Sequence, residues 1–362
     1  MSPWQVTHAP AAVWRMARVS RGRRIVLVLL VLMGLLCGSA EYGPSFGVSP
    51  SLRGSSRLAG AMVVVQVEAE VPVDAEMPVA EGLPPIPCRF VDARGFRWML
   101  AAIDETPSPR WRTGFPIGDE TPRSAGAARG LILPHHDVAA PMIGRILSET
   151  AEALAREGMM PETVILLGPN HAREGANRIQ TFHNDWETPE GIFPADRVWT
   201  EQLARTLTAA GDPRLMEREH SLAYLVPWLT HFFPDASLLP VLISGALNRE
   251  GCRALSETLS ACAAAKRCLV VASIDFSHDR QPEEALAFDE TTWRLILASD
   301  AAGILDLDNR YLDAPPTLAT FLMTMAQATT GSPVLAGHAE ASLFLGKRMD
   351  RTTSYLAVAW PP

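Results

Sequence analysis

Continuous apolar runs alternate with helix-length segments from Gly130 onward, and this alternation limits the possible folds more than any other feature. Strands made only of apolar residues are buried on both faces, as in a sheet covered by helices. The sequence therefore predicts an α/β fold with a central, mostly parallel sheet flanked by helices. The predicted strands are, in chain order, 130–133, 163–167, 237–243, 268–273, 334–335 and 354–359, and the predicted helices are 138–157, 196–210, 221–233, 249–265, 282–299 and 317–328.

The first 40 residues have the order of a secretory signal. Five Arg between Arg15 and Arg24 precede the apolar run Ile25–Cys37, and small residues lead to a candidate cut after Ala40. The run is shorter than the ~20 apolar residues of a spanning helix, and an uncleaved membrane tether through residues 25–40 is the alternative. We therefore expect a periplasmic or membrane-anchored protein. A start codon at Met62 would remove the signal and leave the protein in the cytoplasm.

The rest of the chain divides by composition into two parts. Residues 41–128 are rich in Pro and Gly and are predicted to form a linker and a loosely packed cap. Within this part, 62–67 is a candidate strand and 90–103 a second candidate element. Residues 129–362 form the predicted α/β domain.

Charge and cysteine usage exclude several classes of protein. The net charge is −8, and residues 1–40 hold five Arg and no acid, so the remaining residues carry −8 − 5 = −13. Such an acidic body argues against nucleic-acid binding, which depends on Lys and Arg meeting phosphates. The five Cys include no CxxC pair, which excludes a disulfide framework and a Cys-rich zinc site. No GxGxxG, P-loop or HExxH motif is present.

Histidines follow three of the predicted strands. His135 and His136 come after the first strand, His171 after the second and His278 after the fourth. In open α/β sheets, ligands bind beyond the carboxyl ends of the strands. Because neutral imidazole and carboxylate ligands suit iron, zinc or copper, these histidines are candidate metal ligands. Asp275 is a further candidate, either as a ligand or as an acceptor that fixes an imidazole tautomer.

A second polar group opens the predicted helix that starts near residue 221. Glu219 or Ser221 is either a helix cap or part of the site, and the sequence favours neither role. Metal-independent hydrolysis with a His base is a weaker hypothesis. It would need a serine nucleophile, for which Ser221, Ser273 and Ser277 are the candidates.

Six motifs occur in the order and spacing of the Memo family, whose bacterial members are also called AmmeMemoRadiSam system protein B. The chain resembles this family over residues 130–360. The resemblance implies one domain with a fold like that of class III extradiol dioxygenases, which use non-haem iron. The motifs are LGPNH (Leu167–His171), WETPEG (Trp186–Gly191), EHSLAYLVPWL (Glu219–Leu229), PVLISG (Pro240–Gly245), ASIDFSH (Ala272–His278) and SYLAVAW (Ser354–Trp360).

The resemblance also assigns roles to single residues. The family has a metal site of three His and one Cys, and His135, His171 and His278 match the His of its A-P-H-A-G-Y, G-P-x-H and S-D-F-S-H segments. His220 matches the His of E-H-S-x-E, and Asp275 matches the Asp of S-D-F-S-H. These two are the candidate catalytic residues. The implied cofactor is a divalent metal ion, iron first, with zinc or copper as alternatives.

Two departures from the family pattern change the expected site. The A-P-H-A-G-Y segment reads Leu133–Val138 here and adds His136 and Asp137. The family's Cys-Gly should fall near Leu312-Asp313, where this chain has no Cys. The fourth ligand is therefore Asp313, Asp275, Asp137 or water. Without a soft thiolate, the preference moves from Cu(I) towards Fe(II) or Zn(II).

Two hypotheses of different classes follow. The first is a mononuclear metal protein with redox or dioxygenase-like activity. The second is a non-catalytic module that binds a peptide or a small anion in the same crevice, where helix N-termini favour negative charge. The family name also implies association with a radical-SAM protein. Such a partner is expected in the cytoplasm, which conflicts with export.

Overall fold

The computed structural model describes residues 27–30, 64–67, 82–105 and 122–362. The chain divides into two compact units, Met1–Glu81 and Gly82–Pro362. In the first unit, β1 (Leu27–Leu30) and β2 (Val64–Val67) pair antiparallel, and β2 falls within the candidate strand 62–67. The basic segment of the predicted signal, most of its apolar run and Ala40 lie outside the described residues. Within the described ranges, none of the helices has the length and apolar content needed to span a bilayer.

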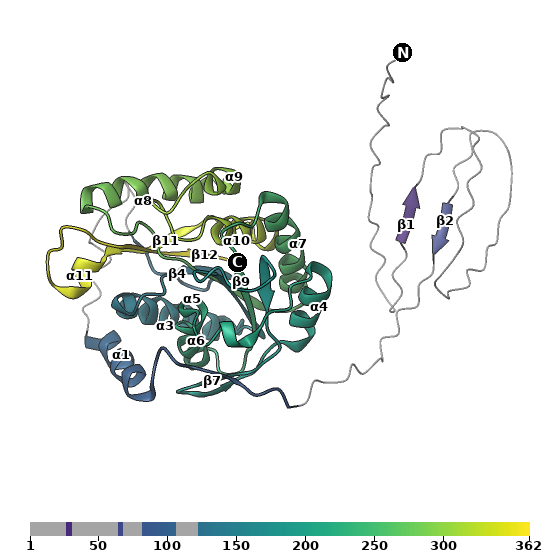
Figure 1. The fold of residues 1–362 in the computed structure, drawn as a ribbon, viewed down its shortest axis with the longest axis horizontal. Coiled ribbons are helices and arrows are strands. Elements are labelled where there is room, and N and C mark those ends of the chain that lie inside the picture. Colours follow the sequence, from purple (N-terminus) through teal and green to yellow (C-terminus); the bar gives the residue numbers. More distant parts are fainter. Residues whose placement is uncertain (1–26, 31–63, 68–81, 106–121) are drawn as a thin grey trace, which may run out of the picture. The chain divides into compact units, whose positions relative to one another are not determined.

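A seven-stranded sheet forms the centre of the second unit (Figure 1). All six predicted strands are present in it, together with β6, which the sequence pattern did not indicate. In sheet order the strands are β11 (Val334–Glu340), β12 (Ser354–Trp360), β4 (Gly130–Leu133), β10 (Cys268–Ser273), β5 (Thr163–Pro169), β9 (Ser237–Ile243) and β6 (Ile179–Thr181).

The strand directions confirm a mostly parallel sheet. The inner strands β4, β10, β5 and β9 are parallel to one another. β12 is antiparallel to β4, β11 is antiparallel to β12, and β6 is antiparallel to β9. β11 therefore points the same way as the inner four, so five of the seven strands share one direction. The carboxyl ends of β4, β10 and β5 meet at one edge.

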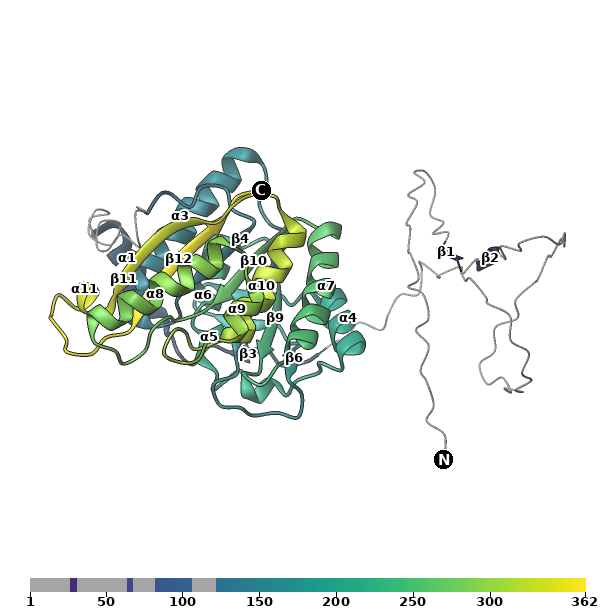
Figure 2. The same cartoon turned by 90° about the horizontal axis from the view of Figure 1, so that it is seen from above.

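Helices cover both faces of the sheet (Figures 1 and 2). Along β4, Leu131 and Leu133 pack into one core cluster and Ile132 into the other. The first cluster includes residues of α1, α3 and α6, and the second includes residues of α7, α8 and α10. The helices are α1 (Ala93–Glu105), α3 (Ala140–Glu157), α4 (Arg197–Leu207), α5 (His220–Ala223), α6 (Val226–Phe232), α7 (Arg249–Ala265), α8 (Pro282–Leu297), α9 (Ala301–Leu305), α10 (Pro315–Ala328) and α11 (Ala341–Leu345), with 3-10 turns η1 (Asp137–Ala139) and η2 (Pro213–Leu215).

The single helix predicted over 221–233 is wrong, because the segment forms α5 and α6. Pro227 lies in the first turn of α6. Proline has no N–H to donate to the preceding turn, so it fits the start of a helix and not its interior. The break gives α6 its own N-terminus, whereas α5 keeps the start of the predicted helix, with His220 as its first residue.

Residues 82–105 pack into the second unit, which corrects the prediction of a loosely packed cap and of a domain start near residue 129. The ring of Phe96 is fully buried and meets Trp228 edge-on, with centroids 5.1 Å apart. A three-stranded sheet of β3 (Ile86–Pro87), β7 (Trp186–Thr188) and β8 (Gly191–Phe193) also ties this segment to the domain. The compact unit starts at Gly82. The other parts of 41–128, at 41–63, 68–81 and 106–121, lie outside the described residues.

The four cysteines in the described part of the chain are free. They are Cys88, Cys252, Cys262 and Cys268, and the sulfurs of the last two are 3.7 Å apart. None of them belongs to a group of side chains that could hold a metal ion. The two groups in the described residues that could hold a metal ion consist of His and Asp side chains.

Candidate metal centre

The candidate ligands lie where parallel strands end. Pro134 follows the last residue of β4, and Pro169 ends β5. Proline cannot donate to the sheet ladder, so both segments turn away from the sheet at these positions. His135 and His171 follow these prolines, and Asp275 follows the end of β10. The shared edge brings these three segments together, as the sequence predicted.

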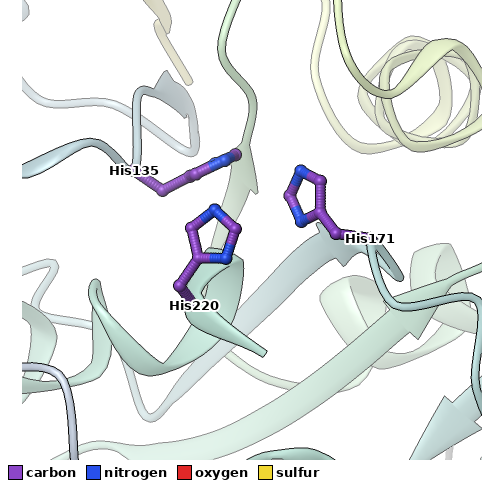
Figure 3. A group of neighbouring side chains, drawn as sticks. All are labelled: His135, His171 and His220. Carbon is purple, nitrogen blue, oxygen red and sulfur yellow. The ribbon is translucent and has the colours of Figure 1, made fainter. Parts of the chain in front are cut away.

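Three imidazole rings face one another at this edge (Figure 3). They belong to His135, His171 and His220, and their ligand atoms all lie within 4.8 Å of one another. The ring centroids are 5.2 Å apart for His135 and His171, and 4.6 Å apart for His171 and His220. We call these residues the first His group. The grouping differs from the predicted ligand set, because His220 joins it while His278 lies with His136 and Asp275.

Asp313 completes this group from the loop before α10. Its Oδ2 lies 3.3 Å from Nε2 of His135 and 3.2 Å from Nε2 of His171. Its Oδ1 is buried and has no hydrogen-bond partner. Of the proposed fourth ligands, Asp313 therefore lies directly beside the imidazoles. Asp137, by contrast, lies in η1, lines a cleft beside α1 and joins neither group.

Glu219 fixes the orientation of His171. One carboxylate oxygen is 2.8 Å from Nδ1 of His171, and the other accepts the backbone N–H of His171 at 2.8 Å. The same side chain caps α5 by accepting the N–H of Ser221. Glu219 thus serves both roles that the sequence left open. When His171 is neutral and Nδ1 donates to Glu219, the lone pair of the ring is on Nε2, which faces Asp313.

We expect Glu219→Ala to weaken metal binding by about 10–100-fold, because an unanchored imidazole must be ordered when it ligates. The change also removes the α5 cap, at about 1 kcal/mol of folding free energy. Asp300→Ala is the matched control, because Asp300 caps α9 in the same way through Gly303. Calorimetric metal titration and metal-free thermal unfolding separate the two effects. Equal metal affinity in both variants would show that Glu219 acts only as a cap.

His135 is buried, and one of its two ring nitrogens has no hydrogen-bond partner. Its Nδ1 lies 3.0 Å from the hydroxyl of Ser273, which itself donates to the carbonyl of Ser221. The hydroxyl must therefore accept from Nδ1–H, which leaves the lone pair on Nε2. This Nε2 is buried and has no hydrogen-bond partner. Such an orphaned acceptor is rare in protein interiors, and a metal ion would satisfy it.

Burial and neighbouring charges shift the pKa values of this group in opposite directions. Burial, followed by the charge of His171, holds the pKa of His135 well below its usual range. Burial and His171 also lower the pKa of His220. For His171, burial lowers the pKa, but hydrogen bonds to Asp313 and Glu219 outweigh it and raise the pKa to about 10. Without metal, His171 therefore carries a proton at neutral pH, whereas His135 does not.

Metal binding should consequently release a proton. His171 must lose its proton before Nε2 can ligate, so affinity should rise as the pH increases from neutral towards the His171 pKa of about 10. Calorimetry at neutral pH in two buffers of different ionisation enthalpy measures this release directly. A binding enthalpy that is identical in both buffers would contradict the expectation.

A cavity of about 860 Å³ opens beside the first His group. His171 and Asp313 lie on its wall, as does His278. Arg173 and Asn309 supply further polar groups. A small molecule in this cavity would reach the open side of the candidate ligands.

The family pattern described as Memo-like protein matches residues 115–314, which is 200 of the 362 residues. The chain belongs to the Memo family. A MEMO1 family protein of Caldivirga maquilingensis is 26% identical over 263 residues, covering 69% of this chain and 91% of the relative. One of Aquifex aeolicus is 31% identical over 175 residues, covering 47% and 61%. A crystal structure of an uncharacterized Escherichia coli K12 protein covers 63% of this chain and 98% of that one, with 14% identity and a TM-score of 0.41.

Membership confirms the resemblance seen in the motifs. The matched range contains His135, His171, His220 and Asp313, together with the neighbouring residues Asp275 and His278. It also contains the departures from the Memo pattern, which are the added His136, Ala223 in place of the second Glu of E-H-S-x-E, and the absence of a Cys near Asp313. The matched range therefore includes every candidate ligand of the metal centre.

Two residues of the site were not foreseen from the sequence. The sequence indicates Ser273 only as a candidate nucleophile, whereas in the structure its hydroxyl fixes the tautomer of His135. Tyr355, on β12, places its hydroxyl 3.2 Å from Nδ1 of His136. Tyr355 belongs to the SYLAVAW motif, but no local signal shows that β12 pairs beside β4.

Proposed function

We propose that this Memo-family protein binds a divalent metal ion, with iron as the first choice, through His135, His171 and Asp313, and that it acts on a small molecule in a redox reaction. The unpartnered, buried Nε2 of His135 carries the proposal, since its lone pair points at the other candidate ligands. Two imidazoles and one carboxylate with open positions are the ligand set of non-haem Fe(II) oxygenases. Zinc or copper are the alternatives.

Other residues around this ligand set would accept a proton and orient the ligands. A bound Fe(II) would supply an open coordination position and an electron for chemistry with O₂. His220 stacks on His171 at 4.6 Å and is half-buried, and its lowered pKa leaves it neutral at physiological pH. It can therefore accept a proton from a molecule bound beside the ligands. Glu219 and Ser273 orient the two imidazole ligands.

Elemental analysis of the full chain tests the proposal. The protein is purified without chelator or His tag and reconstituted anaerobically with Fe(II). We expect bound iron in the unaltered protein and less bound iron in His135→Ala/His171→Ala, because this variant lacks two of the three proposed ligands. His183→Ala/His231→Ala is the matched control, because these two histidines pair with Glu201 and Glu190 outside the site. Equal iron content in both variants would contradict the proposal.

The second candidate function is a binding module without catalysis. Arg173 and His278 on the cavity wall favour it, because both can contact a small anion. This candidate requires no metal. If reconstitution yields no bound iron, zinc or copper, and a small carboxylate still binds in an Arg173-dependent way, this function replaces the first.

A further inference from the structure

Three side chains outside the first His group gather beside it. They are His136, Asp275 and His278, and their ligand atoms all lie within 4.8 Å of one another. Nδ1 of His136 is 3.0 Å from Oδ2 of Asp275, and the rings of His136 and His278 are 5.7 Å apart. The proposed function uses none of the three as a ligand.

Asp275 is buried, and only one of its two carboxylate oxygens has a hydrogen-bond partner. The residue is 0% exposed, and its Oδ1 accepts the backbone N–H of His135 at 3.0 Å. Its Oδ2 has no hydrogen-bond partner, although Nδ1 of His136 is close. A buried carboxylate oxygen is unfavourable unless a donor or a cation satisfies it. Two ligands that bind one ion at about 2.0–2.1 Å lie about 3.3 Å apart in a tetrahedral site, which agrees with this close contact.

We propose that His136, Asp275 and His278 form a second metal site, so that the centre holds two divalent ions. Oδ2 of Asp275 is also 3.7 Å from Nε2 of His135, so this carboxylate lies between the two ligand sets. Paired metal sites in hydrolytic and redox enzymes share ligands in this way. The inference rests on the proposed function only for the first ion.

The exposure of two ligands to solvent and the position of the Tyr355 hydroxyl support the second site. His136 and His278 are both half-buried, and His278 also lines the cavity, so an ion can enter from solvent. The hydroxyl of Tyr355, 3.2 Å from Nδ1 of His136, is the group that the ion would displace. A second ion here would face a molecule bound in the cavity.

The site depends on a residue in which this chain departs from the family. His136 stands where the A-P-H-A-G-Y segment has Ala. A chain with Ala at this position would keep the Asp and the second His but lack the third ligand. We therefore expect the second site in this chain and not in relatives that keep the Ala.

Anaerobic titration of the full chain with Zn(II), a redox-inert probe, tests the second site. After removal of free ion, we expect about two Zn(II) per unaltered chain and about one in His136→Ala. His136→Ala restores the family residue at a half-exposed position, so the fold should tolerate it. His135→Ala/His171→Ala should retain about one Zn(II), held by the second site. His183→Ala should retain both ions.

The outcomes separate this inference from the proposed function. One ion in both the unaltered chain and His136→Ala would overturn the second site and leave the first intact. Two ions in both the unaltered chain and His136→Ala would show that the second ion binds elsewhere. This result would also overturn the proposed second site. No bound ion in the unaltered chain would overturn both sites.

Discussion

Replacing Asp313 with Ala should lower the affinity of the first site for Fe(II) or Zn(II) by about 100-fold, or about 2.7 kcal/mol. The expectation follows from the position of Oδ2, which is 3.3 and 3.2 Å from the ligand nitrogens of His135 and His171. Affinity is measured by competition with a chelator of known strength. Asp308→Ala is the control, because Asp308 lines the same cavity and pairs with Arg310.

The size of this effect should depend on pH. Asp313 is one of the two carboxylates that hold a proton on His171 when no metal is bound. Its removal lowers the His171 pKa and thus weakens the competition between proton and metal. At neutral pH, the weaker competition from the proton raises the metal affinity and partly offsets the affinity lost with the ligand. At a pH where His171 is already deprotonated, there is no such compensation. The loss of affinity should therefore be larger at higher pH, and a pH-independent loss would contradict the described proton.

Asp313→Cys tests selectivity at the same position. The resemblance places the family's Cys in this region, so the change should restore a thiolate beside two imidazoles. Soft thiolates favour Cu(I) and Zn(II) over Fe(II), and we expect about a tenfold or larger shift in that direction. The measured quantity is the ratio of the affinities for Zn(II) and Fe(II). If Asp313→Ala and Asp313→Cys both leave metal binding unchanged, Asp313 is not a ligand.

The position of the candidate site follows from a property of parallel strands. Apolar runs mark the strands, and polar residues just after them collect at one edge, so the convergence of His135, His171 and Asp275 could be predicted. Which ligands share an ion could not. His278 follows Asp275 by three residues, and the path of that loop carries its ring to His136 instead of His171. No periodic pattern specifies such a path.

His220 shows a second limit of the sequence. Its place depends on how α5 sits against β5, where the hydroxyl of Ser221 donates to the carbonyl of Pro169 at 2.9 Å. This is a contact across more than 50 residues of chain. The motif indicated that His220 matters, but only the packed fold shows that its ring joins His135 and His171.

The packing of residues 82–105 is not predicted by the average composition of residues 41–128. Pro and Gly dominate that range, yet Phe96, Met99 and Ile103 recur at helical spacing. They form the face of α1 that packs against the domain, where Phe96 and Met99 are buried. The candidate element 90–103 corresponds to this helix, but its packing into the domain was not predicted.

Phe96→Ala should lower the free energy of unfolding by about 3–5 kcal/mol, the usual loss for a fully buried aromatic ring. The cavity would open against Trp228, whose ring meets Phe96 edge-on at 5.1 Å and cannot move without disturbing α6. Trp98→Ala is the control on the same helix. Trp98 is larger but 73% exposed, so its removal should change stability by no more than about 0.5 kcal/mol.

Urea unfolding of both variants measures the difference. A large loss for Phe96→Ala with an unchanged slope would show that α1 unfolds together with the sheet. A small loss in both variants would mean that α1 melts independently, as a loosely packed cap would. The contrast between two aromatic residues two positions apart depends on burial alone, because they share the same helix and nearly the same local sequence.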